Sequence, residues 1–138
     1  MRKLLYWLAP FYTLVVAYGS LADSPPLPDV SYLYADKLYH GLAYAIMMGL
    51  WYLFFYHRFL ERQLHFEYNI ITILSEWSNT IAVAAGAFSL VIGGLIEIGQ
   101  EYFSQYRTMD GYDMMANLAG IIIASIILWI ISRIISKR

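Results

Sequence analysis

Four apolar runs, each about long enough to cross a lipid bilayer, limit what this chain can fold into. A helix rises about 1.5 Å per residue, so roughly 20 residues cross a hydrocarbon core of about 30 Å. Lipid cannot satisfy backbone hydrogen bonds, and the short alternating strands of a barrel are absent from the sequence. The sequence therefore predicts an all-α integral membrane bundle of four transmembrane helices, at residues 4–21, 37–56, 77–98 and 113–135.

Composition supports a single membrane domain over residues 1–138. Hydrophobic residues make up 60% of the chain, and the net charge of −1 gives no reason to expect a nucleic-acid partner. The absence of cysteine excludes a disulfide framework, a thiol nucleophile and a thiolate metal site. Any site in this membrane protein must therefore be built from side chains other than cysteine.

The segments around the first three runs allow more than one interpretation. Arg2 and Lys3, the apolar run and Ser20-Leu21-Ala22 also resemble a signal peptide with a small-residue cleavage site, which is the alternative to a retained first helix. The proline-rich stretch 23–29 is expected to be a loop outside the lipid. Residues 57–76 are predicted to form a loop with a short interfacial piece.

The distribution of basic residues predicts the orientation. The two ends of the chain and the 57–76 segment carry most of the lysine and arginine, whereas the other side has only Lys37 and Arg107. Because basic residues favour the cytoplasmic side, both termini are predicted to be cytoplasmic. The side with the basic residues holds Arg2, Lys3, Arg58, Arg62, Arg133, Lys137 and Arg138.

Polar residues recur at one depth near the outer ends of three predicted helices. His40 follows Asp36 by four residues, and Asn117 follows Asp113 by four, so each pair lies on one helix face. Glu97 ends the third run at a comparable depth. Since a buried polar group without a partner costs on the order of 1–3 kcal/mol, His40 and Asn117 are expected to face the bundle interior. The polar layer as a whole is expected to form an outward-opening pocket. Small residues near this level favour close helix packing: Gly41, Gly94, Gly99, Ala116 and Gly120.

Each of these residues also has a purely structural interpretation. Asp36 and Asp113 could stabilise helix N-termini, and Asn117 could be an interhelical hydrogen-bonding residue. His40 could be a satisfied interface histidine, and Arg107 could pair with a local carboxylate. His57 and His65 are predicted to be solvated, and the aromatic residues of the second run either face lipid or pack in the core.

A metal site is the less favoured alternative. His40, Glu97, Asp110 and Asp113 supply suitable ligand types, but their spacing matches no fixed metal motif, and surface carboxylates are commonly just hydrated. The residues therefore predict neither a metal nor another cofactor.

Three stretches together are similar to the motifs of the VanZ-like family of bacterial membrane proteins. They are Asp-Lys-x-x-His at 36–40, Glu-x-x-Gln at 97–100, and the Arg, Asp and Asn-x-x-Gly pattern within 107–120. The chain departs from the family pattern at Thr108, where serine is usual, and in the length of the 57–76 segment. The positions carried over by the resemblance are Asp36, Lys37, His40, Glu97, Gln100, Arg107, Asp110, Asp113 and Asn117.

The resemblance implies a multi-pass protein of the bacterial cytoplasmic membrane with its motif residues on the outer side. It also implies an accessory role in the response to glycopeptide antibiotics such as teicoplanin, and to lipopeptide antibiotics. The partners expected are membrane lipid and a lipid-linked cell-wall precursor or the antibiotic itself.

Three functions remain open from the sequence. In an enzyme, Glu97, His40 and Asp113 would be the catalytic acid/base residues, while Lys37 and Arg107 would hold a phosphate. In a binding module, the same pocket would engage a headgroup without chemistry. In a structural helper of a partner protein, the polar residues would only hold the helices together.

Overall fold

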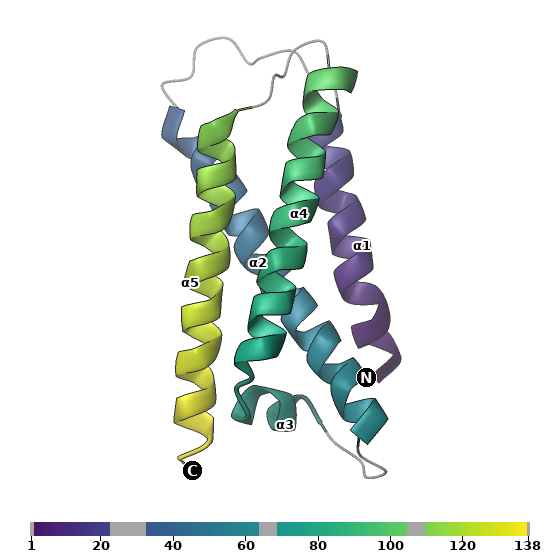
Figure 1. Cartoon of the computed structure of the whole chain (residues 1–138), viewed down its shortest axis with the longest axis vertical. Coiled ribbons are helices and arrows are strands. Elements are labelled where there is room, and N and C mark those ends of the chain that lie inside the picture. Colours follow the sequence, from purple (N-terminus) through teal and green to yellow (C-terminus); the bar gives the residue numbers. More distant parts are fainter. Residues whose placement is uncertain (1, 23–32, 64–68, 105–109, 138) are drawn as a thin grey trace.

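The fold is a bundle of long helices closed at one end by a short one (Figure 1). The computed structural model describes residues 2–22, 33–63, 69–104 and 110–137, and every regular element in these ranges is helical. The all-α prediction is therefore confirmed for the described part of the chain. The helices are α1 (Arg2–Leu21), α2 (Leu33–Gln63), α3 (Ile70–Ser75), α4 (Asn79–Phe103) and α5 (Gly111–Ile135).

Three of the helices, α2, α4 and α5, are long and apolar enough to cross a membrane. This agrees with a membrane protein and with three of the four predicted spans. The fourth predicted span, at α1, stays a prediction. The proline-rich stretch 23–29 lies outside the described residues.

The second helix is longer than the sequence indicated. Its 31 residues extend about 46 Å at 1.5 Å per residue, well beyond a hydrocarbon core of about 30 Å. The prediction of a loop from residue 57 is therefore wrong for residues 57–63, because Arg, Glu, Gln and Leu are strong helix formers that continue the helix past the apolar run. The short piece predicted beyond them is α3, which begins with a capping box between Asn69 and Thr72.

Hydrogen bonds hold α1 antiparallel to α2. The Tyr12 hydroxyl donates to the Ala43 carbonyl at 3.2 Å, and the Trp51 indole donates to Thr13 Oγ1 at 3.0 Å. Near the opposite end of α2, the Tyr6 hydroxyl contacts the Glu61 carboxylate. The start of α1 and the end of α5 thus lie at the same end of the bundle (Figure 1).

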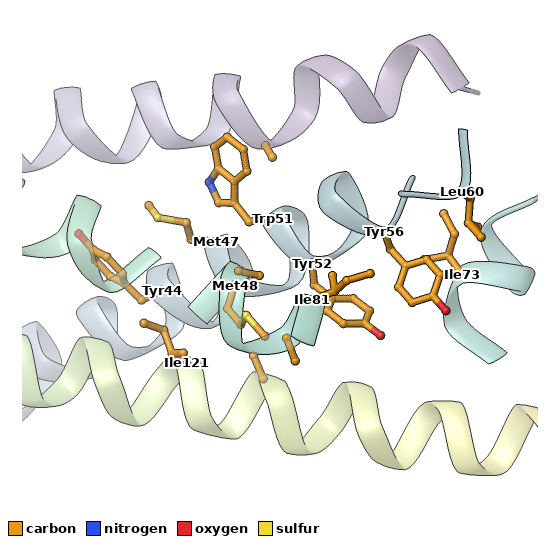
Figure 2. Packing of buried hydrophobic residues seen from close by; sticks show 14 residues of the cluster. Tyr44, Met47, Met48, Trp51, Tyr52, Tyr56, Leu60, Ile73, Ile81 and Ile121 are labelled. Carbon is orange, nitrogen blue, oxygen red and sulfur yellow. The ribbon is translucent and has the colours of Figure 1, made fainter. Parts of the chain in front are cut away.

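The hydrophobic core follows one face of α2 (Figure 2). Tyr44, Met47, Met48, Trp51 and Tyr52 are all buried, at the three- and four-residue spacing of one helix face. Of the two interpretations open for the aromatic residues of this run, core packing holds for these buried ones. The second helix is therefore the central element, against which the other long helices pack.

The prediction of a solvated His57 is wrong. The side chain is completely buried, and its ring meets the Tyr6 ring edge-on at 4.9 Å between centroids. Its Nε2 lies 3.9 Å from Glu61 Oε1. Neighbouring charges misled the prediction, because Arg58 and Glu61 project from the α2 surface while His57 faces inward. His65 lies outside the described residues.

The helices α2 and α5 approach so closely that their backbones touch. A Cβ on Gly120 would lie 2.0 Å from the Gly41 carbonyl oxygen, and one on Gly41 would lie 3.5 Å from the Ala116 carbonyl oxygen. Gly94 is different, because its Cβ would meet only the end of the Met114 side chain, at 3.9 Å. Close packing through small residues is thus confirmed at the crossing of α2 and α5.

Replacing Gly120 by alanine should separate the two helices. We expect Gly120→Ala to destabilise the protein by about 1–3 kcal/mol, the usual cost of forcing extra atoms into a packed interface. Thermal unfolding in detergent, followed by circular dichroism, measures the effect. Gly49→Ala is the matched control, since a Cβ there meets nothing within 4 Å. Equal melting temperatures for the two variants would contradict the contact.

Candidate functional site

Predicted site residues from three helices come together at the end of the bundle opposite the chain termini (Figure 1). They lie in the first turns of α2 and α5 and near the end of α4, so the antiparallel order of the helices brings them to one level. We call this group the polar cluster; its members are Asp36, Lys37, His40, Glu97, Asp110, Asp113 and Asn117.

Lys37 joins α2 to the start of α5. Its Nζ lies 2.6 Å from Asp110 Oδ2, contacts Asp113 Oδ1, and lies 3.3 Å from Asp36 Oδ2. One ammonium group therefore serves three carboxylates. Because these contacts use its three N–H groups, Lys37 has no spare donor for a phosphate unless a carboxylate releases it.

Asp110, rather than Asp113, is the N-cap of α5. Its Oδ1 accepts a hydrogen bond from the backbone N–H of Tyr112 at 2.8 Å. The hydrogen bond from Lys37 lowers the pKa of the Asp110 carboxyl below its usual value, and the weaker effect of the Tyr112 backbone N–H acts in the same direction. The capping interpretation thus fits a residue three positions before the one to which the sequence assigned it.

His40 is the buried centre of the cluster. Its Nδ1 lies 3.2 Å from Asn117 Oδ1 and 3.9 Å from Glu97 Oε1, while its Nε2 lies 3.7 Å from Asp113 Oδ2. An amide oxygen can only accept, so with Asn117 oriented in this way the His40 Nδ1 carries a proton. In the neutral imidazole Nε2 then keeps its lone pair, directed toward carboxylate oxygen.

Glu97 and Asn117 lie at the back of the cluster, almost completely shielded from solvent. Glu97 is 1% exposed, and its Oε2 accepts from the backbone N–H of Asp110 at 3.4 Å. Asn117 is 0% exposed, and its Nδ2 has no hydrogen-bond partner among the described residues. The expected inward orientation of Asn117 is confirmed.

A hollow of about 300 Å³ lies beside the cluster, between α1 and α2. Of the cluster residues, Asp36 and His40 line it, while Glu97, Asp113 and Asn117 are behind them. Its lining residues are Val16, Gly19, Ser20, Asp36, Tyr39, His40, Ala43 and Tyr44. The expected convergence of side chains therefore occurs, but the open space adjoins only one edge of the group.

One of the predicted ligand-binding residues, Gln100, lies apart from the polar cluster. The Gln100 Nε2 donates to the Ser20 carbonyl at 2.9 Å, which ties the end of α4 to the end of α1. Arg107 lies outside the described residues. Tyr44, which the sequence interpretation did not single out, lines the hollow one turn after His40, and that four-residue spacing could have identified it.

Asp36, His40 and Asp113 are the members of the group that could hold a metal ion. Each offers one ligand atom, and the three atoms lie within 4.8 Å of one another. The ligand types considered from the sequence included His40 and Asp113 but not Asp36.

Comparisons with known proteins identified no relative: no family model, no curated protein and no solved structure matches the chain.

Proposed function

We propose that the chain is a VanZ-like protein of the bacterial cytoplasmic membrane, crossing it four times with both termini in the cytoplasm. Three lines of support are the motif residues, the excess of lysine and arginine at one end, and α1, which runs beside α2 for most of its length. In this orientation the polar cluster and its hollow face the outer leaflet.

Cysteine labelling tests this orientation, because the natural chain has no cysteine and each introduced one reports alone. On intact cells, a membrane-impermeant maleimide should label Tyr112→Cys, a site that is 72% exposed beside the cluster. Arg2→Cys and Ser136→Cys, near the two termini, should be labelled only after lysis. Labelling of Arg2→Cys but not Ser136→Cys on intact cells would rule out the fourth span. The reverse pattern at all three sites would show that the protein has the opposite orientation in the membrane.

We further propose that the polar cluster binds the headgroup of a lipid-linked cell-wall component at the outer leaflet, as an accessory to the response to glycopeptide or lipopeptide antibiotics. The observation that carries this proposal is the hollow lined by Asp36 and His40, with buried acids directly behind the imidazole. Carboxylate groups suit hydroxyl and amine groups of a ligand, because they accept hydrogen bonds from both.

Buried Glu97 beside His40 also favours a second candidate function, acid/base catalysis on the bound headgroup. In this function Glu97 would exchange a proton through His40, whose imidazole lies between two carboxylates. The ligand and its binding surface stay the same, so the two functions differ only in the part that Glu97 has.

Binding of a polyprenyl-diphosphate-linked disaccharide-peptide to the protein in nanodiscs tests both functions. We expect His40→Gln to weaken binding by roughly tenfold or more, the effect of losing one hydrogen bond to a charged group of the ligand. Glu97→Gln should leave binding largely intact and abolish turnover if the protein is an enzyme. Glu101→Gln, one turn further along α4 on the exposed surface, is the matched control.

A third outcome would support the alternative function, a structural helper of a partner protein. In that case neither the natural protein nor any variant would bind the probe, while His40→Gln and Glu97→Gln would both lower the melting temperature. Unchanged probe binding in His40→Gln would contradict the proposed role of the polar cluster.

A further inference from the structure

The polar cluster carries more negative than positive charge at the edge that faces the hollow. Among the described residues, the cluster holds four carboxylates and one ammonium group, which contacts three of them, so the formal charge is −3 when every carboxylate is ionised and His40 is neutral. The four are Asp36, Glu97, Asp110 and Asp113. Concentrated negative charge beside a low-dielectric membrane is unfavourable without a further cation.

The orientation of His40 also favours a cation beside these acids. In the neutral tautomer that donates from Nδ1 to Asn117, the lone pair on Nε2 faces Asp113 Oδ2 across 3.7 Å. Two acceptors repel each other unless a cation or a proton lies between them. A metal-bound histidine typically has this arrangement, with its second ring nitrogen donating to a nearby oxygen that fixes the tautomer.

Distances and chemistry agree with a small divalent ion. Zinc lies about 2 Å from nitrogen and oxygen ligands, so two of its ligand atoms lie roughly 3–4 Å apart. The 3.7 Å between His40 and Asp113 is in this range, and the 4.8 Å limit for the set including Asp36 is only slightly wider. Lys37 contacts one carboxylate oxygen of Asp36 and one of Asp113. Each carboxylate therefore has a second oxygen that can bind a metal ion.

A buried polar group without a partner lies next to His40, on the Nδ1 side of its ring. Asn117, fully buried against His40, leaves its Nδ2 donor without a hydrogen-bond partner among the described residues. Such a donor costs on the order of 1–3 kcal/mol unless something accepts from it. An acceptor from outside the protein, such as a bound water molecule, would satisfy this donor.

We propose that Asp36, His40 and Asp113 bind one divalent transition-metal ion, such as Zn²⁺, with Asn117 and Lys37 orienting the ligands. One histidine and two carboxylates suit such an ion better than Ca²⁺ or Mg²⁺, which prefer oxygen alone. With three protein ligands and a hollow at its side, the ion keeps coordination positions open to a ligand, as catalytic metal sites do. This site goes beyond the proposed function, because an ion binds whether or not a headgroup does.

Metal titration of the purified full-length protein in detergent, with no lipid-linked probe present, tests the proposal. Co²⁺ serves as the spectroscopic probe and Zn²⁺ as its competitor. We expect one equivalent of Co²⁺ to bind with the absorption bands of a nitrogen- and oxygen-ligated ion, and Zn²⁺ to displace it. If His40 is instead simply protonated and Lys37 alone balances the acids, no saturable binding occurs, and the proposal is overturned without any variant.

Variants then locate the ion. His40→Gln and Asp36→Asn should each weaken Co²⁺ binding more than tenfold, and Asn117→Leu should weaken it by about 10- to 100-fold, as loss of an orienting partner does. His57→Gln, which removes the buried histidine near the other end of α2, is the matched control and should bind as the natural protein does. Equal binding by the His40→Gln/Asp36→Asn double variant would place the ion elsewhere and overturn the assignment.

Two further measurements distinguish the metal site from a purely structural role and from the proposed headgroup binding. Melting temperatures without metal show whether a variant is folded, and a structural role alone would change them without changing Co²⁺ affinity in the folded fraction. Probe binding repeated with a chelator shows whether the headgroup needs the ion. Failure of probe binding together with intact Co²⁺ binding would reject the proposed function and leave the metal site standing.

Discussion

The backbone contact between Gly41 and Gly120 determines where the polar side chains of α2 and α5 meet. Without a Cβ on Gly120 the two helices approach to contact, and a side chain there would collide with the Gly41 carbonyl. Lys37 lies one helical turn before Gly41, while Asn117 and Asp113 lie about one and two turns before Gly120. The contact therefore places a lysine and a histidine from one helix against an aspartate and an asparagine from the other.

Burial at this crossing makes partners obligatory. Glu97, Asp113 and Asn117 are all shielded from solvent, and a charge or amide in such a place is costly unless it is paired. Lys37 pairs with three carboxylates, and the backbone N–H of Asp110 donates a hydrogen bond to Glu97. The same contacts that hold the helices thus orient His40 toward the hollow, so the fold and the candidate site share one set of interactions.

Local sequence patterns were enough to predict the level and face of the main polar residues. The four-residue spacings of Asp36 with His40 and of Asp113 with Asn117 need only helix geometry, and lipid exposure is too costly for either pair. The same logic found the small residues at the crossing of α2 and α5. It could also have found Tyr44, which continues the face of Asp36 and His40 by one more turn.

Details that depend on tertiary contacts could not be predicted in this way. Nothing local to Gln100 shows that its amide reaches the Ser20 carbonyl of another helix, or that Lys37 is shared by acids more than 70 positions away. Helix ends were also missed, because a membrane-length criterion stops at the last apolar residue while the backbone of α2 continues through residues 57–63.

A double-mutant cycle between Lys37 and Asp113 measures most directly whether α2 and α5 meet through the polar cluster. Unfolding free energies in detergent would be compared for Lys37→Met, Asp113→Asn and the double variant, with Lys37→Met and Glu61→Gln as a reference pair at opposite ends of α2. A coupling energy of about 1 kcal/mol or more is expected for Lys37 with Asp113, and about zero for the reference pair. Additive effects of Lys37→Met and Asp113→Asn would contradict the cluster and every proposal built on it.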